Sequence, residues 1–259
     1  MKMHIHKIFP FRLITFDVTN TILNFTADIG KIYSETGEKY GVKCDPNELT
    51  QNFKRNYKVM NAKNPNFGQG TGISWQNWWN IVVNETFKNC HSDLSDSKLN
   101  SISKDLIAEY KKSRCWKPAP GALDLLNYLK DRGVRLGVIS NFDPRLHDIL
   151  SGINMNSYFK FVLTSYESGI CKPNRKIFEK AMTESELKNL RNAECLHVGD
   201  TFELDYIGAK SAGWKSFLIL RKKSIDLVDN KVLDKNHVFE DLRNLQDYME
   251  LQWNSYSVQ

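Results

Sequence analysis

Residues 13–23 of this chain read LITFDVTNTIL, an apolar run that stops at Asp17 and gives way to small polar residues. In an open α/β sheet, ligands bind at the carboxyl ends of the strands, which is where such a carboxylate lies. Many strands end on an aspartate, so this stretch alone does not identify a site. The pattern recurs at residues 195–200, CLHVGD, where a second apolar run ends at Asp200. Two such runs predict two carboxylates at one edge of a sheet.

Short apolar runs alternate with helical segments through the second half of the chain. This alternation predicts an α/β fold with a doubly wound, Rossmann-like parallel sheet, because each helix must pack back onto the sheet. Helices are expected after Asp143-Pro144, after Asn174 and after Thr201, since these residues can cap a first turn. Five apolar runs are expected to be buried strands: residues 12–17, 135–140, 160–164, 194–199 and 215–220.

The stretch from residue 25 to residue 114 has a different character. It contains no convincing strand pattern, and apolar residues such as Leu99 and Ile102 recur at helical spacing. We therefore expect residues 25–114 to form a helical cap inserted after the first strand. The core then consists of residues 11–24 plus 115–250, and a chain of 259 residues is long enough for this arrangement.

Composition argues against several kinds of partner. Hydrophobic residues make up 41% of the chain, enough for a core, but no run is long enough to span a membrane. The net charge is +6, yet the basic residues are spread out, so no nucleic-acid partner is expected. Five cysteines without close pairing suggest reduced thiols and an intracellular, cytoplasmic location. The sequence leaves the oligomeric state open.

Asp17 stands where a nucleophile would stand. A carboxylate can attack phosphorus and form an acyl-phosphate, which splits one difficult step into two. Asp200 can share a Mg²⁺ with Asp17, because Mg²⁺ prefers one or two carboxylates together with phosphate oxygens and water. Lys172 would neutralise phosphoryl charge, and the Ser140 hydroxyl would donate to a phosphoryl oxygen. These residue types predict a site for an anion and a metal.

The order of these residues resembles the haloacid dehalogenase (HAD) superfamily. The resemblance covers the two core segments and implies a hydrolase, in particular a Mg²⁺-dependent phosphatase. Its substrate would be a small phosphate ester, and its intermediate an aspartyl-phosphate on Asp17. Four motifs carry the resemblance: residues 17–21, DVTNT; residues 139–141, ISN; residues 172–173, KP; and residues 199–205, GDTFELD.

The resemblance also implies a metal site. It assigns Mg²⁺ contacts to Asp17, to Asp200 and to the carbonyl of Thr19. Asp205 would support either the metal shell or Lys172. A helix-surface acid at Asp205 and a solvated lysine at Lys172 remain the ordinary structural alternatives.

Substrate contacts follow from the same resemblance. Ser140, Asn141 and Lys172 are implied to bind the phosphoryl group. Residues 140–143, SNFD, and residues 75–79, WQNWW, are moreover similar to one poorly characterised animal branch of the superfamily.

Thr19 departs from the family pattern. HAD phosphatases usually carry a second acid two residues after the nucleophile, which protonates the leaving group and then activates water. A threonine hydroxyl cannot do this, and general acid–base help is worth about 10²–10⁴-fold in rate. The sequence therefore allows a slow phosphatase, an enzyme with an acid from elsewhere, or a catalytically weak interaction protein. A carbon–halogen hydrolase is disfavoured, because such enzymes need no metal.

Several other residues have an ordinary structural interpretation. The tryptophans Trp75, Trp78 and Trp79 are expected to pack in a core rather than to form a substrate platform. His197 lies inside an expected strand, so a buried histidine with satisfied hydrogen bonds is favoured over a catalytic one. Cys171 is expected to be a bystander thiol, because no base lies within reach in the sequence.

Overall fold

A computed structural model describes residues 10–220 and 233–254. Its main sheet has six strands: β1 (Leu13–Phe16), β4 (Arg135–Ser140), β5 (Phe161–Thr164), β6 (Cys195–Gly199), β7 (Lys215–Ile219) and β8 (Val238–Phe239). They lie in the order β5-β4-β1-β6-β7-β8, and each neighbouring pair is parallel. The expected doubly wound parallel fold is confirmed, and each of the five expected strands agrees within one residue at either end. The two-residue β8 was not expected.

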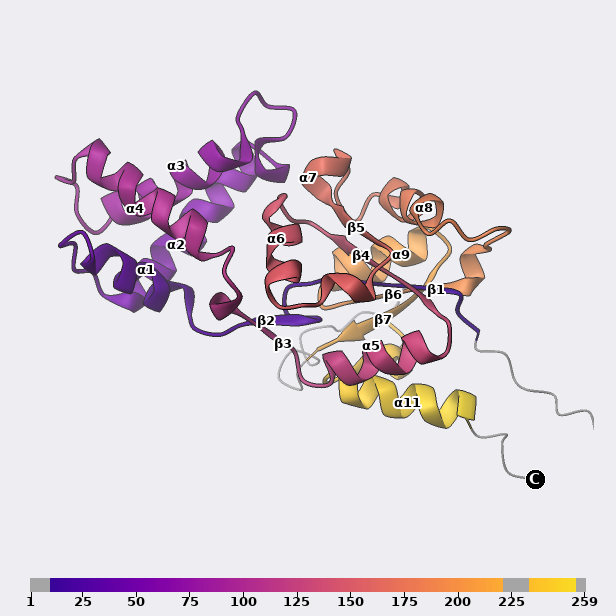
Figure 1. The fold of residues 1–259 in the computed structure, drawn as a ribbon. Coiled ribbons are helices and arrows are strands. Elements are labelled where there is room, and N and C mark those ends of the chain that lie inside the picture. The colour runs from indigo at the N-terminus through magenta and orange to yellow at the C-terminus, as the bar shows by residue number, and fades with distance from the viewer. Residues whose placement is uncertain (1–9, 221–232, 255–259) are drawn as a thin grey trace, which may run out of the picture.

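Helices cover both faces of this sheet. These are α5 (Ala122–Asp131), α11 (Leu242–Asn254), α8 (Arg175–Glu184) and α9 (Gly208–Ser211). Figure 1 shows α5 and α11 on one face and α8 and α9 on the other. Successive residues of a strand point to opposite faces. Ile14 and Phe16 accordingly join the apolar cluster of α5 and α11, whereas Leu13 joins the cluster of α8.

The stretch expected to form a cap is helical. It contains α1 (Ile29–Glu38), α2 (Pro46–Lys63), α3 (Trp75–Lys88) and α4 (Asp96–Glu109), with the short η1 (Asn66–Gly68) and η2 (Ser113–Cys115). Asp45, Ser74 and Ser95 cap the N-termini of α2, α3 and α4 through their side chains. Figure 1 shows these helices as a group beside the sheet, and we call the group the cap.

The tryptophans of α3 divide between two roles. Trp78 is fully buried, and its Nε1 donates to the carbonyl of Asn64 at 2.8 Å. It packs with Met60 and Val82, so the core interpretation is confirmed for this residue. Trp79 packs against the same cluster and also lines a cavity described below.

Two short strands carry the chain between core and cap. β2 (Leu23–Phe25) pairs antiparallel with β3 (Trp116–Pro118) in a separate two-stranded sheet. From the sequence alone, residues 116–120, WKPAP, predict only a linker that two prolines stiffen. Pro118 is compatible with a strand here because both strands of a two-stranded sheet are edge strands, where a missing N–H is tolerated.

The remaining helices are short: α6 (Arg145–Gly152), η3 (Asn156–Tyr158), α7 (Ser165–Ser168), η4 (Asn192–Glu194), η5 (Phe202–Ile207) and η6 (Lys235–His237). Asn174 caps α8 as expected, with its side chain accepting from Lys176 N. Two expected caps need correction. Pro144 precedes the first residue of α6, although Asp143 Oδ1 accepts from Arg145 N. Thr201 precedes η5, a π-helix, but its side chain makes no capping bond.

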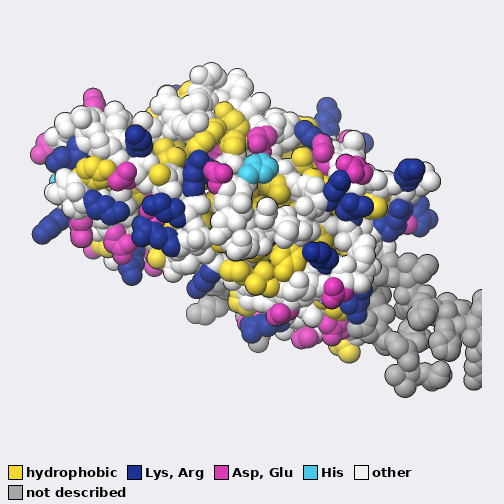
Figure 2. Space-filling model, in the orientation of Figure 1, with side chains coloured by type: hydrophobic (Ala, Val, Ile, Leu, Met, Phe, Trp, Pro, Cys, Tyr) yellow, Lys and Arg dark blue, Asp and Glu magenta, His cyan; other side chains and the backbone are white. Residues whose placement is uncertain are grey.

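Charged side chains are dispersed over the surface. On the face shown in Figure 2, Lys and Arg alternate with Asp and Glu. The basic run at residues 111–114 is engaged in ion pairs, since Lys111 pairs with Asp148 and Lys112 pairs with Glu109. The sequence has a second basic run at residues 221–223 and two histidines near its start, His4 and His6, and all of these lie outside the described residues. No helix of the described part is both long and apolar enough to cross a bilayer.

Candidate active site

Segments far apart in the sequence meet at the carboxyl ends of three adjacent strands. β1 lies between β4 and β6 in the sheet. Asp17 follows β1, Ser140 ends β4, and Asp200 follows β6. Lys172 reaches them from the loop between α7 and α8, and its ammonium contacts Asp17. The structure thus brings the predicted motif residues to one edge of the sheet.

Asp17 is held by two donors. The Ser140 Oγ donates to Asp17 Oδ1 at 3.0 Å, and the Lys172 Nζ donates to the same oxygen at 2.7 Å. Burial raises the pKa of Asp17, and the ammonium of Lys172 opposes that rise. The carboxylate is therefore fixed in one orientation beside a positive charge, which suits a nucleophile that attacks an anionic group.

Lys172 lies at the centre of the hydrogen-bond network. Its Nζ also donates to the Ile139 carbonyl at 2.8 Å and to Asp205 Oδ1 at 2.6 Å. Burial acts to lower the pKa of Lys172, but the carboxylates of Asp17 and Asp205 outweigh it, so that the pKa is raised. Lys172 is thus a buried, paired cation, and the solvated-lysine alternative is wrong.

Asp205 supports Lys172 rather than facing solvent. Its Oδ1 contacts Lys172 and, at 3.0 Å, His197 Nε2, while its Oδ2 accepts from Thr201 N at 2.9 Å. Burial opposes ionisation, yet the charge of Lys172 lowers the pKa of Asp205. Of the two roles implied for Asp205, the structure shows the contact with Lys172, and the helix-surface alternative is wrong. The π-helical turn η5 carries this residue, and π-turns are frequent at functional sites.

His197 is a buried structural histidine, as expected. Its Nδ1 lies 2.8 Å from Thr15 Oγ1, and its Nε2 contacts the Asp205 carboxylate, which can only accept. Burial lowers the pKa of His197, so the ring is neutral, with its proton on Nε2. The imidazole therefore orients Asp205, and through it Lys172.

Asp200 carries a negative charge that the described protein groups only partly compensate. The Thr201 hydroxyl donates to Asp200 Oδ1 at 3.2 Å. Burial, together with the nearby carboxylates of Asp17 and Asp205, raises the pKa of Asp200 to about 7. Three carboxylates thus share one ammonium, that of Lys172. A divalent cation beside Asp17 and Asp200 would relieve this excess, because its charge favours ionised ligands.

The donor set fits Mg²⁺ in particular. Among the described residues, no group of three or more His, Cys, Asp or Glu side chains is arranged to hold a metal. Two carboxylates and a backbone carbonyl remain, and Mg²⁺ commonly takes only one or two carboxylates from the protein. Asp17, Asp200 and the Thr19 carbonyl make up such a set, and this metal site stays a prediction.

Thr19 and Asn141 border the site on the cap side, where both line the cavity. The Asn141 side chain is already engaged. Its Nδ2 donates to the Lys172 carbonyl at 3.0 Å, and its Oδ1 accepts from Lys172 N at 2.8 Å. In this structure Asn141 thus positions the lysine loop, whereas its predicted contact with substrate stays a prediction.

The comparisons with known proteins agree with this geometry. The family model for haloacid dehalogenase-like hydrolases matches residues 11–213. The chain belongs to this family. It is 45% identical to the Rhythmically expressed gene 2 protein of Drosophila melanogaster, over 90% of this chain and 92% of that protein. It is 33% identical to the human haloacid dehalogenase-like hydrolase domain-containing protein 3, over the same shares.

The animal branch expected from residues 75–79 and 140–143 is the one to which these two relatives belong, so that prediction is confirmed. Among solved structures, the HAD-hydrolase YfnB from Bacillus subtilis, bound to magnesium, superposes with a TM-score of 0.67. It is 18% identical and covers 93% of this chain and 99% of its own, so the likeness is one of fold.

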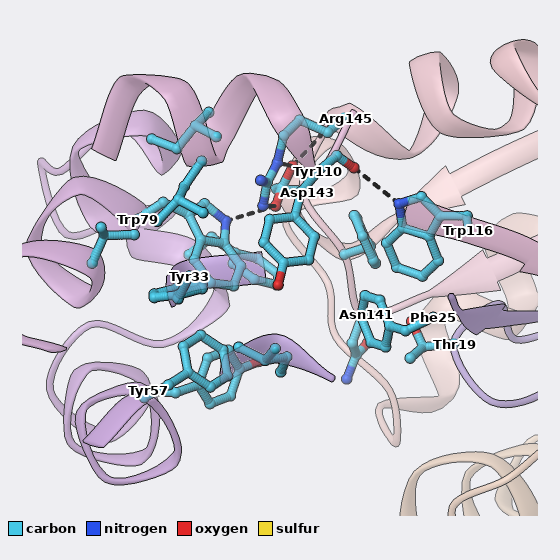
Figure 3. A pocket seen from close by; sticks show the side chains of 17 residues that line it. Thr19, Phe25, Tyr33, Tyr57, Trp79, Tyr110, Trp116, Asn141, Asp143 and Arg145 are labelled. Carbon is cyan, nitrogen blue, oxygen red and sulfur yellow. Dashed lines mark hydrogen bonds and ion pairs between the residues drawn. The ribbon is translucent and has the colours of Figure 1, made fainter. Parts of the chain in front are cut away.

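In this HAD-like hydrolase a cavity of about 310 Å³ lies between cap and core (Figure 3). All four long cap helices contribute to its walls, and the core contributes Thr19 and the segment after β4. Seventeen residues line it: Thr19, Phe25, Ile29, Tyr33, Phe53, Tyr57, Phe67, Trp79, Val83, Leu106, Ile107, Tyr110, Trp116, Asn141, Phe142, Asp143 and Arg145.

An ion pair of the core lies at one wall of this cavity, where Trp79 of the cap binds it, and the sequence does not reveal this contact. Arg145 NH2 and Asp143 Oδ2 lie 2.7 Å apart, with both side chains buried. Trp79 Nε1 donates to the same Asp143 oxygen at 2.8 Å, and the Arg145 guanidinium lies 4.7 Å from a Trp79 ring centroid. The only signal in the sequence is the Asp-Pro-Arg stretch at residues 143–145, which by itself predicts a helix cap. Trp79 thus packs against the apolar cluster of the cap, as expected, and in addition lines the cavity.

Cys171 behaves as expected. Burial raises the pKa of its thiol, which disfavours the reactive thiolate. All five cysteines are free.

Proposed function

We propose that this HAD-like hydrolase is a Mg²⁺-dependent phosphatase that acts on a small phosphate ester through an aspartyl-phosphate on Asp17. One observation carries the proposal: a buried carboxylate at the carboxyl edge of the sheet, bonded to Ser140 and Lys172. A serine hydroxyl and a lysine ammonium are the donors that a phosphoryl group needs, and here both already converge beside the attacking group.

Each residue of the candidate active site has its own role in the proposed reaction. Asp17 attacks phosphorus and later releases the phosphoryl group to water. Lys172 and Ser140 bind the phosphoryl oxygens and stabilise the charge that develops on them. Asp205 and His197 hold Lys172 in place. Mg²⁺, bound by Asp17, Asp200 and the Thr19 carbonyl, would neutralise charge and orient the phosphoryl group.

The threonine at position 19 leads us to expect a low turnover rate. With no carboxyl group at this position, protonation of the leaving alcohol and activation of water lack the usual group. We therefore propose a slow enzyme whose acyl-phosphate breaks down more slowly than it forms.

Two alternatives stand beside this proposal. A catalytically weak interaction protein is supported by Thr19 alone. A carbon–halogen hydrolase is disfavoured by Asp200, whose raised pKa marks a place suited to a cation that such enzymes do not need. We further propose a reducing intracellular, cytoplasmic setting, supported by the five free cysteines. A small molecule, rather than a nucleic acid or a membrane, is the proposed partner.

A panel of phosphorylated metabolites, assayed with and without Mg²⁺, tests the proposal. Wild type should release phosphate only with Mg²⁺, and Asp17→Asn should release none. Beryllium fluoride, an acyl-phosphate mimic, should raise the melting temperature of wild type by mass action but not that of Asp17→Asn. An equal shift in both proteins would place the anion elsewhere and refute the role of Asp17.

A further inference from the structure

The cavity beside the candidate active site is small and has almost wholly apolar walls. Thirteen of its seventeen lining side chains are aromatic or aliphatic, so contacts with a bound molecule would be mainly hydrophobic. Its volume of about 310 Å³ lies at the lower end of the range for ligand sites, roughly 300–1,000 Å³. Thr19 and Asn141 line it; Thr19 lies two residues after Asp17, and Asn141 directly follows Ser140.

The charged and amide groups of the cavity wall already have partners. The side chains of Asp143 and Arg145 form two hydrogen bonds with each other, and Trp79 also binds Asp143. The amide of Asn141 binds the backbone of Lys172. The walls offer few hydroxyl groups, those of Thr19 and three tyrosines, so a sugar would leave some of its hydroxyls without partners, at about 1–3 kcal/mol for each.

The hydroxyl of Tyr110 is the one lining hydroxyl that is both fully buried and unpaired among the described residues. Figure 3 shows the Tyr110 ring directed into the space enclosed by the lining side chains. Unpaired buried hydroxyls are uncommon in folded proteins, and a water or another bound group is a regular partner in such cases.

We infer that the substrate is a phosphate monoester of a small, largely apolar alcohol that carries one hydrogen-bonding group. The carbon skeleton fills the cavity, the polar group meets the Tyr110 hydroxyl, and the phosphoryl group lies on Asp17. This inference rests on the proposed phosphatase function, because it assigns the leaving group of that reaction. Polyol phosphates are excluded by the same walls that admit an aromatic or alicyclic group.

Benzyl phosphate and glycerol 3-phosphate test the apolar preference. Both release a primary alcohol, so their intrinsic reactivity is similar while their polarity differs. We expect wild type to show a kcat/KM at least about 10-fold higher for benzyl phosphate, since even one methylene in an apolar pocket is worth about 10–200-fold. Equal values, or a preference for glycerol 3-phosphate, would overturn the inference.

A matched pair of variants locates the preference in the cavity. Val83 is 2% exposed and lines the cavity, whereas Val59 is 61% exposed on the same cap. Val83→Trp should lower the benzyl phosphate to acetyl phosphate ratio of kcat/KM by about 10-fold or more, by the same apolar contacts. Val59→Trp should leave that ratio unchanged. A ratio unaffected by Val83→Trp would place the alcohol outside the cavity.

Tyr110→Phe tests the hydrogen bond without changing the cavity's shape. Among the three isomeric methoxybenzyl phosphates, at least one should exceed benzyl phosphate in kcat/KM for wild type. That advantage should disappear in Tyr110→Phe. If no isomer has a higher kcat/KM than benzyl phosphate, or if that higher kcat/KM persists in Tyr110→Phe, the assignment of the polar group is wrong.

A binding measurement separates failure of this inference from failure of the proposed function. Benzylphosphonate cannot be hydrolysed, so its effect on the melting temperature with Mg²⁺ reports binding alone. If acetyl phosphate is hydrolysed by wild type and not by Asp17→Asn, but benzylphosphonate produces no shift, the function stands and the substrate class is wrong. If nothing is hydrolysed but benzylphosphonate stabilises wild type and not Val83→Trp, the phosphatase proposal fails and the ligand class survives.

Discussion

The buried charges around Lys172 should be strongly coupled, and a double-mutant cycle measures this. Lys172→Met removes three hydrogen bonds and leaves Asp17 and Asp205 without their shared cation. The side chains of Lys172 and Asp205 are 1% and 2% exposed, so solvent cannot replace the lost partner. Removing one member of a buried pair costs about 3–5 kcal/mol, and we expect Lys172→Met to lie in this range.

Asp205→Asn should behave differently in the two backgrounds. In wild type it removes a hydrogen-bonded carboxylate while Lys172 keeps Asp17, so a loss of about 1–3 kcal/mol is expected. In the Lys172→Met background the same change removes a negative charge that faces Asp17 uncompensated. There it should cost nothing or stabilise, which gives an interaction energy of about 2–3 kcal/mol.

Urea unfolding at neutral pH with EDTA measures the cycle. Tryptophan fluorescence and circular dichroism should be followed together, because coincident transitions are needed for a two-state treatment of cap and core. The exposed pair Arg175–Glu179, at 2.8 Å, is the control, and Arg175→Met with Glu179→Gln should show a coupling of only about 0.3–0.5 kcal/mol. Additivity of the two buried substitutions within about 0.5 kcal/mol would refute the picture of one shared cation.

Three further outcomes are expected. Thr19→Asp should supply the missing acid and so speed breakdown of the phosphoenzyme formed from acetyl phosphate by roughly 10-fold or more. If the variant loses activity while the wild type turns over rapidly, the acid must come from another residue. Because folding raises the pKa of Asp200 to about 7, the folded state binds this proton more tightly than the unfolded state does. The free energy of unfolding therefore falls as the pH rises from about 4 to 7. Asp200→Asn in EDTA should therefore raise the melting temperature more at pH 8 than at pH 5, and should abolish stabilisation by Mg²⁺; equal gains at both pH values would contradict this. Trp79→Phe removes the hydrogen bond to Asp143 and should lower the free energy of unfolding by about 1 kcal/mol, which urea unfolding checks.

The sheet and the catalytic edge were predictable because each rests on a local pattern. Buried parallel strands read as short apolar runs, and parallel topology brings their carboxyl ends together. Asp17 and Asp200 each stand at the end of such a run, so the parallel order of the strands alone predicts that they lie at the same edge of the sheet. His197 was assigned correctly for a similar reason, because a histidine inside a buried strand must satisfy both ring nitrogens locally.

Other features depend on contacts that leave no periodic signal. The contact between Trp79 and Asp143 joins residues 64 positions apart, and neither neighbourhood indicates the other. β2 and β3 have three residues each, too few for an alternation to show. The π-turn η5 directs Asp205 towards Lys172, whereas the sequence indicated only a helix after Thr201.

The pairing of β2 with β3 has a consequence for how this protein could have been assembled. The chain leaves the core at Phe25 and returns at Trp116, and these two residues are direct cross-strand partners. Topologically, the helical insertion is the loop of a β-hairpin. Deleting it would leave ends whose Cα atoms are already about 4.5–5.5 Å apart, a gap that a two-residue turn closes. A different insertion can therefore replace the helical one at this hairpin while the strand register that aligns Asp17 stays unchanged. In such a fold, substrate selectivity and catalytic chemistry can evolve independently.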